Sequence, residues 1–161
     1  MKKFVGAICS AVAGVFTFIL LSLNWLSVKD GDSIHAWDIM KDGESIDGYS
    51  LFKLSGILLV ILAVLLIASA VVVTLQKLNV IKLKFDLNKL NTILLTVFAG
   101  ISILMIIAAF IMAADMTFTE TIMGVTVSVK TNVAIGAWLM TVTAIVTCVI
   151  AWIFSRKSTQ K

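Results

Sequence analysis

Residues 77–89 read Lys-Leu-Asn-Val-Ile-Lys-Leu-Lys-Phe-Asp-Leu-Asn-Lys, and they separate two long uncharged runs from two others. The segment carries four lysines against one aspartate. In membrane proteins, Lys and Arg concentrate in cytoplasmic loops and so set the orientation of the chain. We therefore expect this segment to be a cytoplasmic loop, with one helical hairpin on each side of it.

The uncharged runs around this loop are residues 4–28, 54–76, 90–114 and 131–155. Each exceeds the roughly 20 residues that a helix needs to cross a bilayer. The chain is 60% hydrophobic, with a mean hydropathy of +1.09. Helices satisfy their own backbone hydrogen bonds in lipid. The sequence therefore predicts one membrane domain over residues 1–161, an all-α four-helix bundle with outer loops at 29–53 and 115–130 and an inner loop at 77–89.

The charges are distributed unequally between the two sides of this predicted topology. Nine of the 13 basic residues fall at the termini and in the inner loop, namely Lys2, Lys3, Lys77, Lys82, Lys84, Lys89, Arg156, Lys157 and Lys161. Eight of the nine acidic residues fall in the outer loops. This bias predicts a multi-pass plasma-membrane protein with both termini in the cytoplasm. The outer loops contain neither cysteine nor an N-glycosylation sequon, which favours a bacterial inner membrane.

Two interpretations of the inner loop stay open. Its apolar and polar residues alternate between Ile81 and Asn88. In the first interpretation, this alternating segment lies among lipid headgroups, with the lysines at 77, 82, 84 and 89 on anionic lipid. Alternatively, it continues one of the adjacent helices.

Small residues recur at helical spacing on the first and fourth runs, where they allow helix backbones to approach closely in lipid. On the first run they are Gly6, Ser10, Ala13 and Gly14. On the fourth run they form a heptad seam of Ala137, Thr141, Ala144, Cys148 and Ala151. We expect a left-handed bundle in which the first and fourth spans pack through these faces. Contact with a partner helix is the alternative.

Both outer loops contain segments typical of β-structure. Residues 117–122 and 125–129 are rich in β-branched side chains and flank Met123-Gly124, a pattern that predicts a β-hairpin. In the first outer loop, residues 33–40 and 45–52 are candidate strands beside Asp-Gly turn signals. A lone hairpin is marginal in water. We therefore expect it to pair with these strands in a small extracellular sheet that caps the bundle.

Three of the four tryptophans mark ends of the predicted spans. Trp25, Trp138 and Trp152 lie near span ends, where tryptophan anchors a protein at the membrane interface. Trp37 lies in the acidic first outer loop and is expected in the core of the small sheet rather than as a contact residue. The candidate outer contact surface comprises Trp37, Asp38, Phe118, Glu120 and Val127.

In topology the whole chain resembles the claudin-type four-span layout. The resemblance rests on Trp25 at the end of the first run, Trp37 in the first loop and Gly136-Ala137-Trp138 at the start of the fourth run. Ala36-Trp37-Asp38 stands where claudins carry Gly-Leu-Trp, and the paired cysteines of claudins are absent. The chain is therefore more similar to the small uncharacterised bacterial four-span proteins with this layout, and a junction-forming role is not implied.

The predicted spans contain no charged side chain, and proton relays and coupled transporters depend on such groups. The chain has no proline, whereas many transporters build their sites from broken helices. Catalytic and phosphate-binding motifs are also missing. His35 with Asp30, Asp32 and Asp38 would form a weak cation site, but a solvated acidic loop is favoured. We predict no enzyme activity, no metal and no cofactor.

By elimination, the sequence predicts a non-enzymatic membrane protein that acts through protein–protein interaction. An accessory subunit of a membrane transport or secretion complex, or an immunity-type protein, fits this pattern. Its partners are the lipid bilayer and a protein in the membrane or outside it, and no nucleic acid. The alternative is a homo-oligomeric channel, small-solute transporter or holin. An enzyme with its chemistry in the outer loop ranks third.

Overall fold

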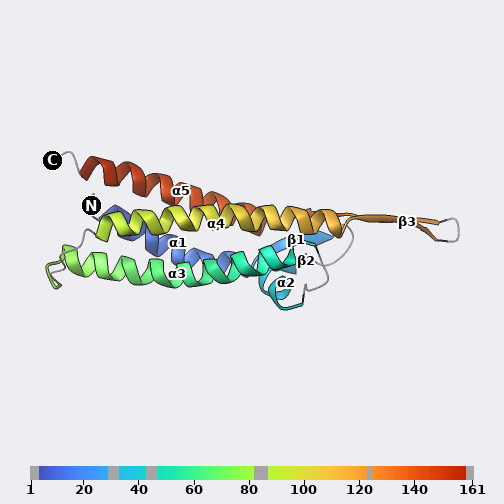
Figure 1. Ribbon diagram of the computed structural model, residues 1–161, viewed down its shortest axis with the longest axis horizontal. Helices are drawn as coiled ribbons and strands as arrows, with labels where there is room; N and C mark the ends of the chain where they lie inside the picture. The colour runs from blue at the N-terminus through green and yellow to red at the C-terminus, as the bar shows by residue number, and fades with distance from the viewer. Residues whose placement is uncertain (1–3, 29–32, 43–46, 82–86, 123–124, 159–161) are drawn as a thin grey trace.

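The computed structural model describes residues 4–28, 33–42, 47–81, 87–122 and 125–158. Four long helices lie side by side in it (Figure 1), namely α1 (Val5–Leu21), α3 (Tyr49–Lys77), α4 (Leu87–Asp115) and α5 (Ile135–Ser158). Both α1 and α4 pack against α3 and α5, so the helices form a bundle. The start of α1, the end of α3, the start of α4 and the end of α5 share one end of the bundle, which we call the inner end. The strands lie at the opposite, outer end.

Three of these helices are long and apolar enough to cross a membrane, judged by length and composition over the described residues, and their apolar stretches are Tyr49–Lys77, Lys89–Asp115 and Ile135–Phe154. Helix α1 is also apolar but is shorter, with 17 residues. The protein is thus mostly helical, with a small three-stranded sheet at its outer end.

Helix α1 ends at Leu21, which corrects the prediction of a helix over residues 4–28. The chain continues as strand β1 (Asn24–Val28). The indole Nε1–H of Trp25 donates a hydrogen bond to the carbonyl oxygen of Leu20 at 2.9 Å, and the Leu23 N–H donates to the same carbonyl at 3.2 Å. The Trp25 ring is fully buried and meets the Phe52 ring edge-on, with centroids 5.5 Å apart. The extended backbone is favoured because it places this large ring in the core.

In its described residues, the first outer loop contains one short strand and one short helix rather than two strands. Strand β2 (Ser33–His35) is followed by α2 (Ala36–Asp42). Ala36, Ile39 and Met40 are buried at helical spacing, so a helix places all three in the core. The predicted strand over residues 45–52 is also wrong in its second half, because α3 begins at Tyr49. The Tyr49 hydroxyl donates to the Met40 carbonyl at 3.0 Å and ties α2 to α3.

The predicted hairpin is confirmed, but its predicted pairing is not. Strands β3 (Phe118–Ile122) and β4 (Val125–Val129) are antiparallel, with Ile122 opposite Val125. The other sheet has the strand order β2-β1-β5, and its third strand is β5 (Thr131–Val133). The sequence assigned residues 131–133 to the fourth span, whereas α5 begins at Ile135. The small sheet therefore joins the two outer loops through β5 and not through the hairpin.

At the inner end, α3 stops at a defined C-terminal motif. Asn79 adopts a left-handed conformation with φ 58°. Its N–H donates to the Gln76 carbonyl at 3.1 Å, and the Val80 N–H donates to the Leu75 carbonyl at 3.0 Å. This pair of bonds is a Schellman motif, which ends a helix. The inner loop is therefore not a continuation of α3. Residues 82–86, with Lys82 and Lys84, lie outside the described part of the chain.

Candidate functional site

Strand β1 connects the two outer loops. Leu26 pairs with Ile34 of β2 on one side and with Val133 of β5 on the other. The Ala134 N–H then donates to the Trp25 carbonyl at 2.7 Å. A Cβ built on Gly136 would lie 2.6 Å from the backbone oxygen of Asn24, so the start of α5 packs on β1 more closely than any larger residue permits. We call the sheet β2-β1-β5 and helix α2 together the outer platform.

Two threonines fix the base of the hairpin to the end of α4. The Thr117 hydroxyl donates to the Ala113 carbonyl at 2.7 Å. It also accepts a hydrogen bond from the Thr131 backbone N–H at 3.1 Å. The Thr131 hydroxyl donates to the Met116 carbonyl at 3.3 Å. Both ends of the hairpin are therefore held against the same helix end.

The hairpin projects away from the outer platform, as Figure 1 shows for β3. Its two strands pair with each other from Phe118 and Val129 at the base to Ile122 and Val125. No other strand among the described residues pairs with either of them. Each strand therefore keeps one backbone edge free of strand pairing, and such an edge is a template for another strand.

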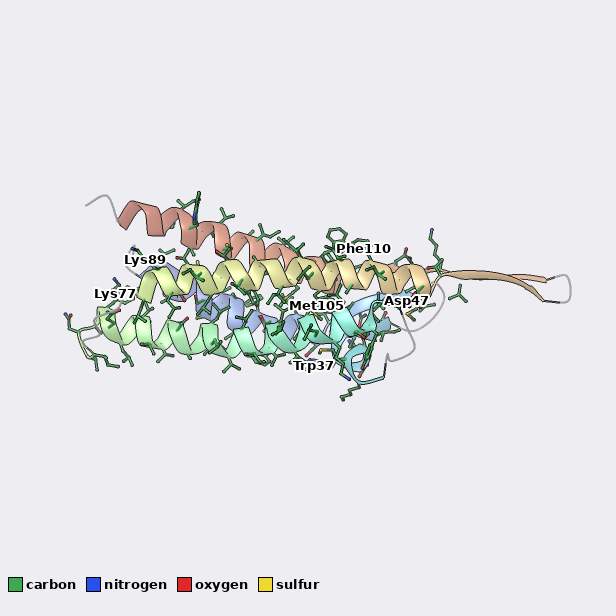
Figure 2. All side chains as sticks on the ribbon, in the orientation of Figure 1. Trp37, Asp47, Lys77, Lys89, Met105 and Phe110 are labelled. Atoms are coloured by element: carbon green, nitrogen blue, oxygen red, sulfur yellow. The ribbon has the colours of Figure 1, made fainter. Side chains whose placement is uncertain are left out.

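The predicted outer contact residues divide between two places. Glu120 and Val127 lie opposite each other in the hairpin, and Phe118 lies at its base. Trp37 and Asp38 lie on α2, in the outer platform. The Trp37 side chain (Figure 2) is half-buried and packs against the main core, which includes Trp25 and Leu26 of β1, and Asp38 is exposed. The structure therefore does not bring these five residues together into one surface.

The acidic first outer loop offers little chemistry within its described part. His35 and Asp38 are exposed, and Asp30 and Asp32 lie outside the described residues. Over the residues that the structure describes, no three His, Cys, Asp or Glu side chains lie close enough together to hold a metal ion. The Asp115 carboxylate at the end of α4 accepts a hydrogen bond from the Asp47 N–H at 3.0 Å. This carboxylate ties the first loop to the bundle.

The small residues of α1 face α3 and α4. Ser10, Ala13 and Gly14 are buried. A Cβ on Gly14 would lie 2.6 Å from Cγ1 of Ile67 in α3, and a Cβ on Gly6 would lie 3.3 Å from the Asn91 amide nitrogen in α4. This arrangement corrects the expectation that the small face of α1 packs against the fourth span. The close contact goes to α3 because the glycine admits the branched Ile67 side chain.

The small residues of α5 are also turned inward. Ala137, Ala144 and Ala151 are buried. Thr141 and Cys148 are partly buried, and the Cys148 sulfur lies 3.6 Å from the Thr96 hydroxyl of α4. This seam therefore contacts α4 at Cys148. Helices α1 and α5 also pack against each other, and an apolar groove lies between them.

Asn91 is the polar centre that the sequence reasoning missed. Its side chain is 2% exposed, near the start of α4. Its Oδ1 accepts hydrogen bonds from the hydroxyls of Ser10 at 2.6 Å and Ser69 at 2.8 Å, and its Nδ2 donates to the Gly6 carbonyl at 2.8 Å. One amide thus joins α1, α3 and α4. The available signal was that Asn91 is the one amide residue in the uncharged run 90–114.

The predicted interface anchors occupy different environments. Trp138 is 51% exposed, and its ring meets Phe110 edge-on at 5.7 Å between centroids. Trp152 is about half exposed on the outside of α5. Trp25 contacts only protein because it is fully buried. Lys77 and Lys89 lie at the inner end (Figure 2), where Lys89 is exposed and Lys77 is half-buried.

No protein-family model, curated protein or solved structure matches the chain. The resemblance to the claudin-type layout therefore stays a prediction from the sequence.

Proposed function

We propose that the chain is a non-enzymatic four-span membrane protein that binds another protein through the hairpin β3–β4. Its four helices, α1 included, cross the bilayer. Their outward faces support this placement, because large apolar side chains such as Ile61, Ile107 and Val149 are exposed there. Such a surface is suited to lipid, since contiguous exposed apolar surface is rare on soluble monomers.

In the proposed orientation, the inner end of the bundle faces the cytoplasm. The helix ends nearest both termini and the inner loop share this end, and nine of the 13 basic residues belong to these segments. The positive-inside rule then places both termini inside. The outer platform and the hairpin face the exterior, which in a bacterium is the far side of the inner membrane.

The projecting hairpin is the single observation that carries the proposed function. A two-stranded hairpin is marginal in water on its own, whereas an added strand supplies the missing backbone partners. Its base is fixed to α4 through Thr117 and Thr131, so a partner bound there is held at a constant distance from the membrane. An accessory subunit of a transport or secretion complex, or an immunity-type protein, must hold its partner at such a fixed distance from the membrane.

The test removes the hairpin and leaves its base intact. Phe118 and Val129 are register partners, so a two-residue Asn-Gly turn replaces residues 119–128 and closes a short hairpin between them. Thr117 and Thr131 keep their hydrogen bonds. A control chain carries a flexible Gly-Ser segment of equal length at 119–128. Affinity capture from mild detergent, followed by mass spectrometry, compares both with the unaltered chain.

We expect a protein that is captured by the unaltered chain and lost from both variants. Equal capture by all three chains, or no specific capture by any, would contradict the proposed function. A parallel assay measures dye and ion flux in liposomes that contain the purified protein alone. We expect no flux above that of empty liposomes. Robust flux would instead favour the homo-oligomeric channel or holin.

A further inference from the structure

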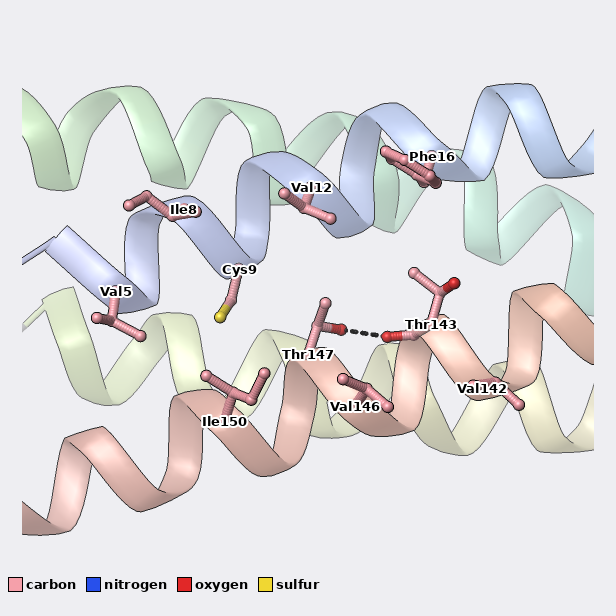
Figure 3. Close-up of a pocket in the computed structure, with 10 residues that line it drawn as sticks. All are labelled: Val5, Ile8, Cys9, Val12, Phe16, Val142, Thr143, Val146, Thr147 and Ile150. Atoms are coloured by element: carbon pink, nitrogen blue, oxygen red, sulfur yellow. Dashed lines mark hydrogen bonds between the residues drawn. The ribbon is translucent and has the colours of Figure 1, made fainter.

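An apolar groove runs between α1 and α5 (Figure 3). Helix α1 contributes residues from Val5 to Phe16, and α5 contributes residues from Val142 to Ile150. Most of these side chains are valine, isoleucine or phenylalanine, so they present hydrocarbon to the groove. Two threonines of α5, Thr143 and Thr147, interrupt this lining. The groove therefore combines an apolar surface with two hydroxyl groups.

A threonine hydroxyl inside a helix often donates to the carbonyl four residues earlier in the same helix. Thr147 follows this pattern, because its hydroxyl donates to the Thr143 carbonyl at 2.8 Å (Figure 3). The same kind of bond is made by Thr17, Thr74, Thr96 and Thr141. These five hydroxyls are thus satisfied by backbone oxygens of their own helices.

The Thr143 hydroxyl differs from these five. The Thr143 side chain is half-buried and points from α5 into the groove (Figure 3). Within the described part of the chain, its hydroxyl makes no hydrogen bond, either to its own helix or to another residue. A hydroxyl without a hydrogen-bond partner costs free energy in apolar surroundings. The groove therefore contains one unused donor and acceptor.

The depth of Thr143 in the proposed membrane arrangement separates its hydroxyl from lipid headgroups. Trp138 and Trp152 are exposed on α5, and tryptophan prefers the two interfaces of a bilayer. At 1.5 Å per residue, Thr143 lies about 8 Å from Trp138 and about 14 Å from Trp152 along the helix. Acyl chains surround this depth and offer no hydrogen bond. We therefore expect the partner of the hydroxyl to come from a polypeptide.

A second copy of the chain meets this requirement. Copies that share one membrane and one orientation form a closed dimer about a twofold axis along the membrane normal. Such an axis keeps every residue at the same depth as its equivalent, so it brings two Thr143 hydroxyls to one level. A hydroxyl both donates and accepts, and two of them can therefore form a hydrogen bond between the copies. Threonine side chains join helices in this way inside membranes.

The surface around Thr143 is also open to a second copy. Val142 and Val146 of α5 and Phe16 of α1 are each about half exposed. Helix α5 is the least buried of the three long apolar helices in the described part of the chain. We propose that two copies of the chain dimerise through the groove between α1 and α5, with a hydrogen bond between their Thr143 hydroxyls. The proposal rests on the four-span topology of the proposed function but not on the hairpin or its partner.

The test measures association of the purified full-length chain in liposomes, where no other protein is present. Energy transfer between donor-labelled and acceptor-labelled copies, at several ratios of protein to lipid, gives a dissociation constant for the dimer. Thr143→Val removes the hydroxyl and keeps the shape of the side chain, whereas Thr143→Ser keeps the hydroxyl. Thr141→Val is the matched control, because the Thr141 hydroxyl donates to the Ala137 carbonyl of its own helix.

We expect the unaltered chain, Thr143→Ser and Thr141→Val to dimerise with similar dissociation constants. Thr143→Val should raise the dissociation constant at least about threefold, which corresponds to an average hydrogen bond between membrane helices. A monomeric unaltered chain would overturn the proposal. So would equal constants for Thr143→Val and Thr141→Val, because the Thr143 hydroxyl would then be satisfied within its own helix.

A second measurement locates the interface between the copies. In a chain with Cys9→Ala and Cys148→Ala, either Thr143→Cys or Ile145→Cys supplies a single thiol. Iodine oxidises two such thiols to a disulfide where the copies bring them together. Ile145 is exposed on α5 but does not line the groove.

We expect disulfide-linked dimers from Thr143→Cys and none from Ile145→Cys. Equal linkage at both positions, or linkage at neither, would overturn the proposed interface. Melting temperatures establish that each variant is folded. Because the purified chain is tested without a partner, loss of the hairpin's partner and loss of the dimer are separate results.

Discussion

Asn91 concentrates the polar contacts between helices in one side chain. It accepts hydrogen bonds from Ser10 and Ser69 and donates one to Gly6. Hydrogen bonds between membrane helices contribute about 0.6 kcal/mol on average and up to about 2 kcal/mol. These hydrogen bonds also fix the geometry of the bundle. Because one amide oxygen accepts from both α1 and α3, it sets the rotation of both helices against α4.

We predict that Asn91→Ala lowers the free energy of unfolding by about 1–3 kcal/mol, because it removes three interhelical hydrogen bonds and leaves a cavity. The measurement is thermal or denaturant unfolding in detergent. Ser102→Ala is the matched control on the same helix. Ser102 is also fully buried, but its hydroxyl donates to the Phe98 carbonyl of α4 itself. Its removal should cost less than Asn91→Ala, because it breaks one hydrogen bond within a single helix and none between helices. Equal decreases in the free energy of unfolding for both variants would contradict a special contribution of the hydrogen bonds between helices.

The sequence shows the polarity of position 91 but not its partners. Ser10, Ser69 and Asn91 come from three separate helices, and which of their faces meet depends on the packing of the whole bundle. Similarly, Trp25 at the end of an apolar run has the pattern of an interface anchor. Its burial follows from strand β1, which no local signal distinguished from helix.

At the scale of elements, local patterns were the most informative. The hairpin β3–β4 could be predicted because its strands are adjacent in the sequence and β-branched on both sides of a glycine turn. The sheet β2-β1-β5 could not be predicted, since β1 and β5 are separated by most of the chain. Helix α2 was missed because seven residues provide too few turns for a clear helical period.

The contact between α1 and α3 depends on Gly14. We predict that Gly14→Ala destabilises the protein by about 1–3 kcal/mol, because the new methyl group would lie 2.6 Å from the Ile67 side chain and 2.8 Å from the Ala63 carbonyl. Gly100→Ala is the matched control in α4, where a Cβ has no neighbour within 4 Å. It should be neutral or stabilise by up to about 1 kcal/mol through helix propensity. The measurement is the melting temperature of each variant in the same detergent, and a stable Gly14→Ala would refute the close contact.

On the scale of the whole molecule, the inner and outer ends should lie on opposite sides of a membrane. We predict that a membrane-impermeant maleimide labels Ser33→Cys on intact cells and labels Val80→Cys only after permeabilisation. Both side chains are exposed, at the outer and inner ends respectively. The native cysteines give a low background, because Cys9 is buried and Cys148 is partly buried.

The reverse labelling pattern would invert the proposed orientation. Equal labelling of both positions on intact cells would contradict the membrane-spanning arrangement itself. The unaltered chain, which keeps only Cys9 and Cys148, measures the background in each condition.

The 17 residues of α1 have a further consequence for the surrounding bilayer. A helix of this length reaches about 26 Å, whereas a typical hydrocarbon core is about 30 Å thick. The three companion helices are long enough to span it. In the proposed four-span arrangement, we therefore expect a bilayer of typical thickness to be thinned beside α1 but not beside α3 and α4. This mismatch on one side of the bundle costs fractions of a kcal/mol per ångström. We therefore expect the protein to be more stable in thin, short-chain bilayers and to concentrate in the thinner regions of a heterogeneous membrane.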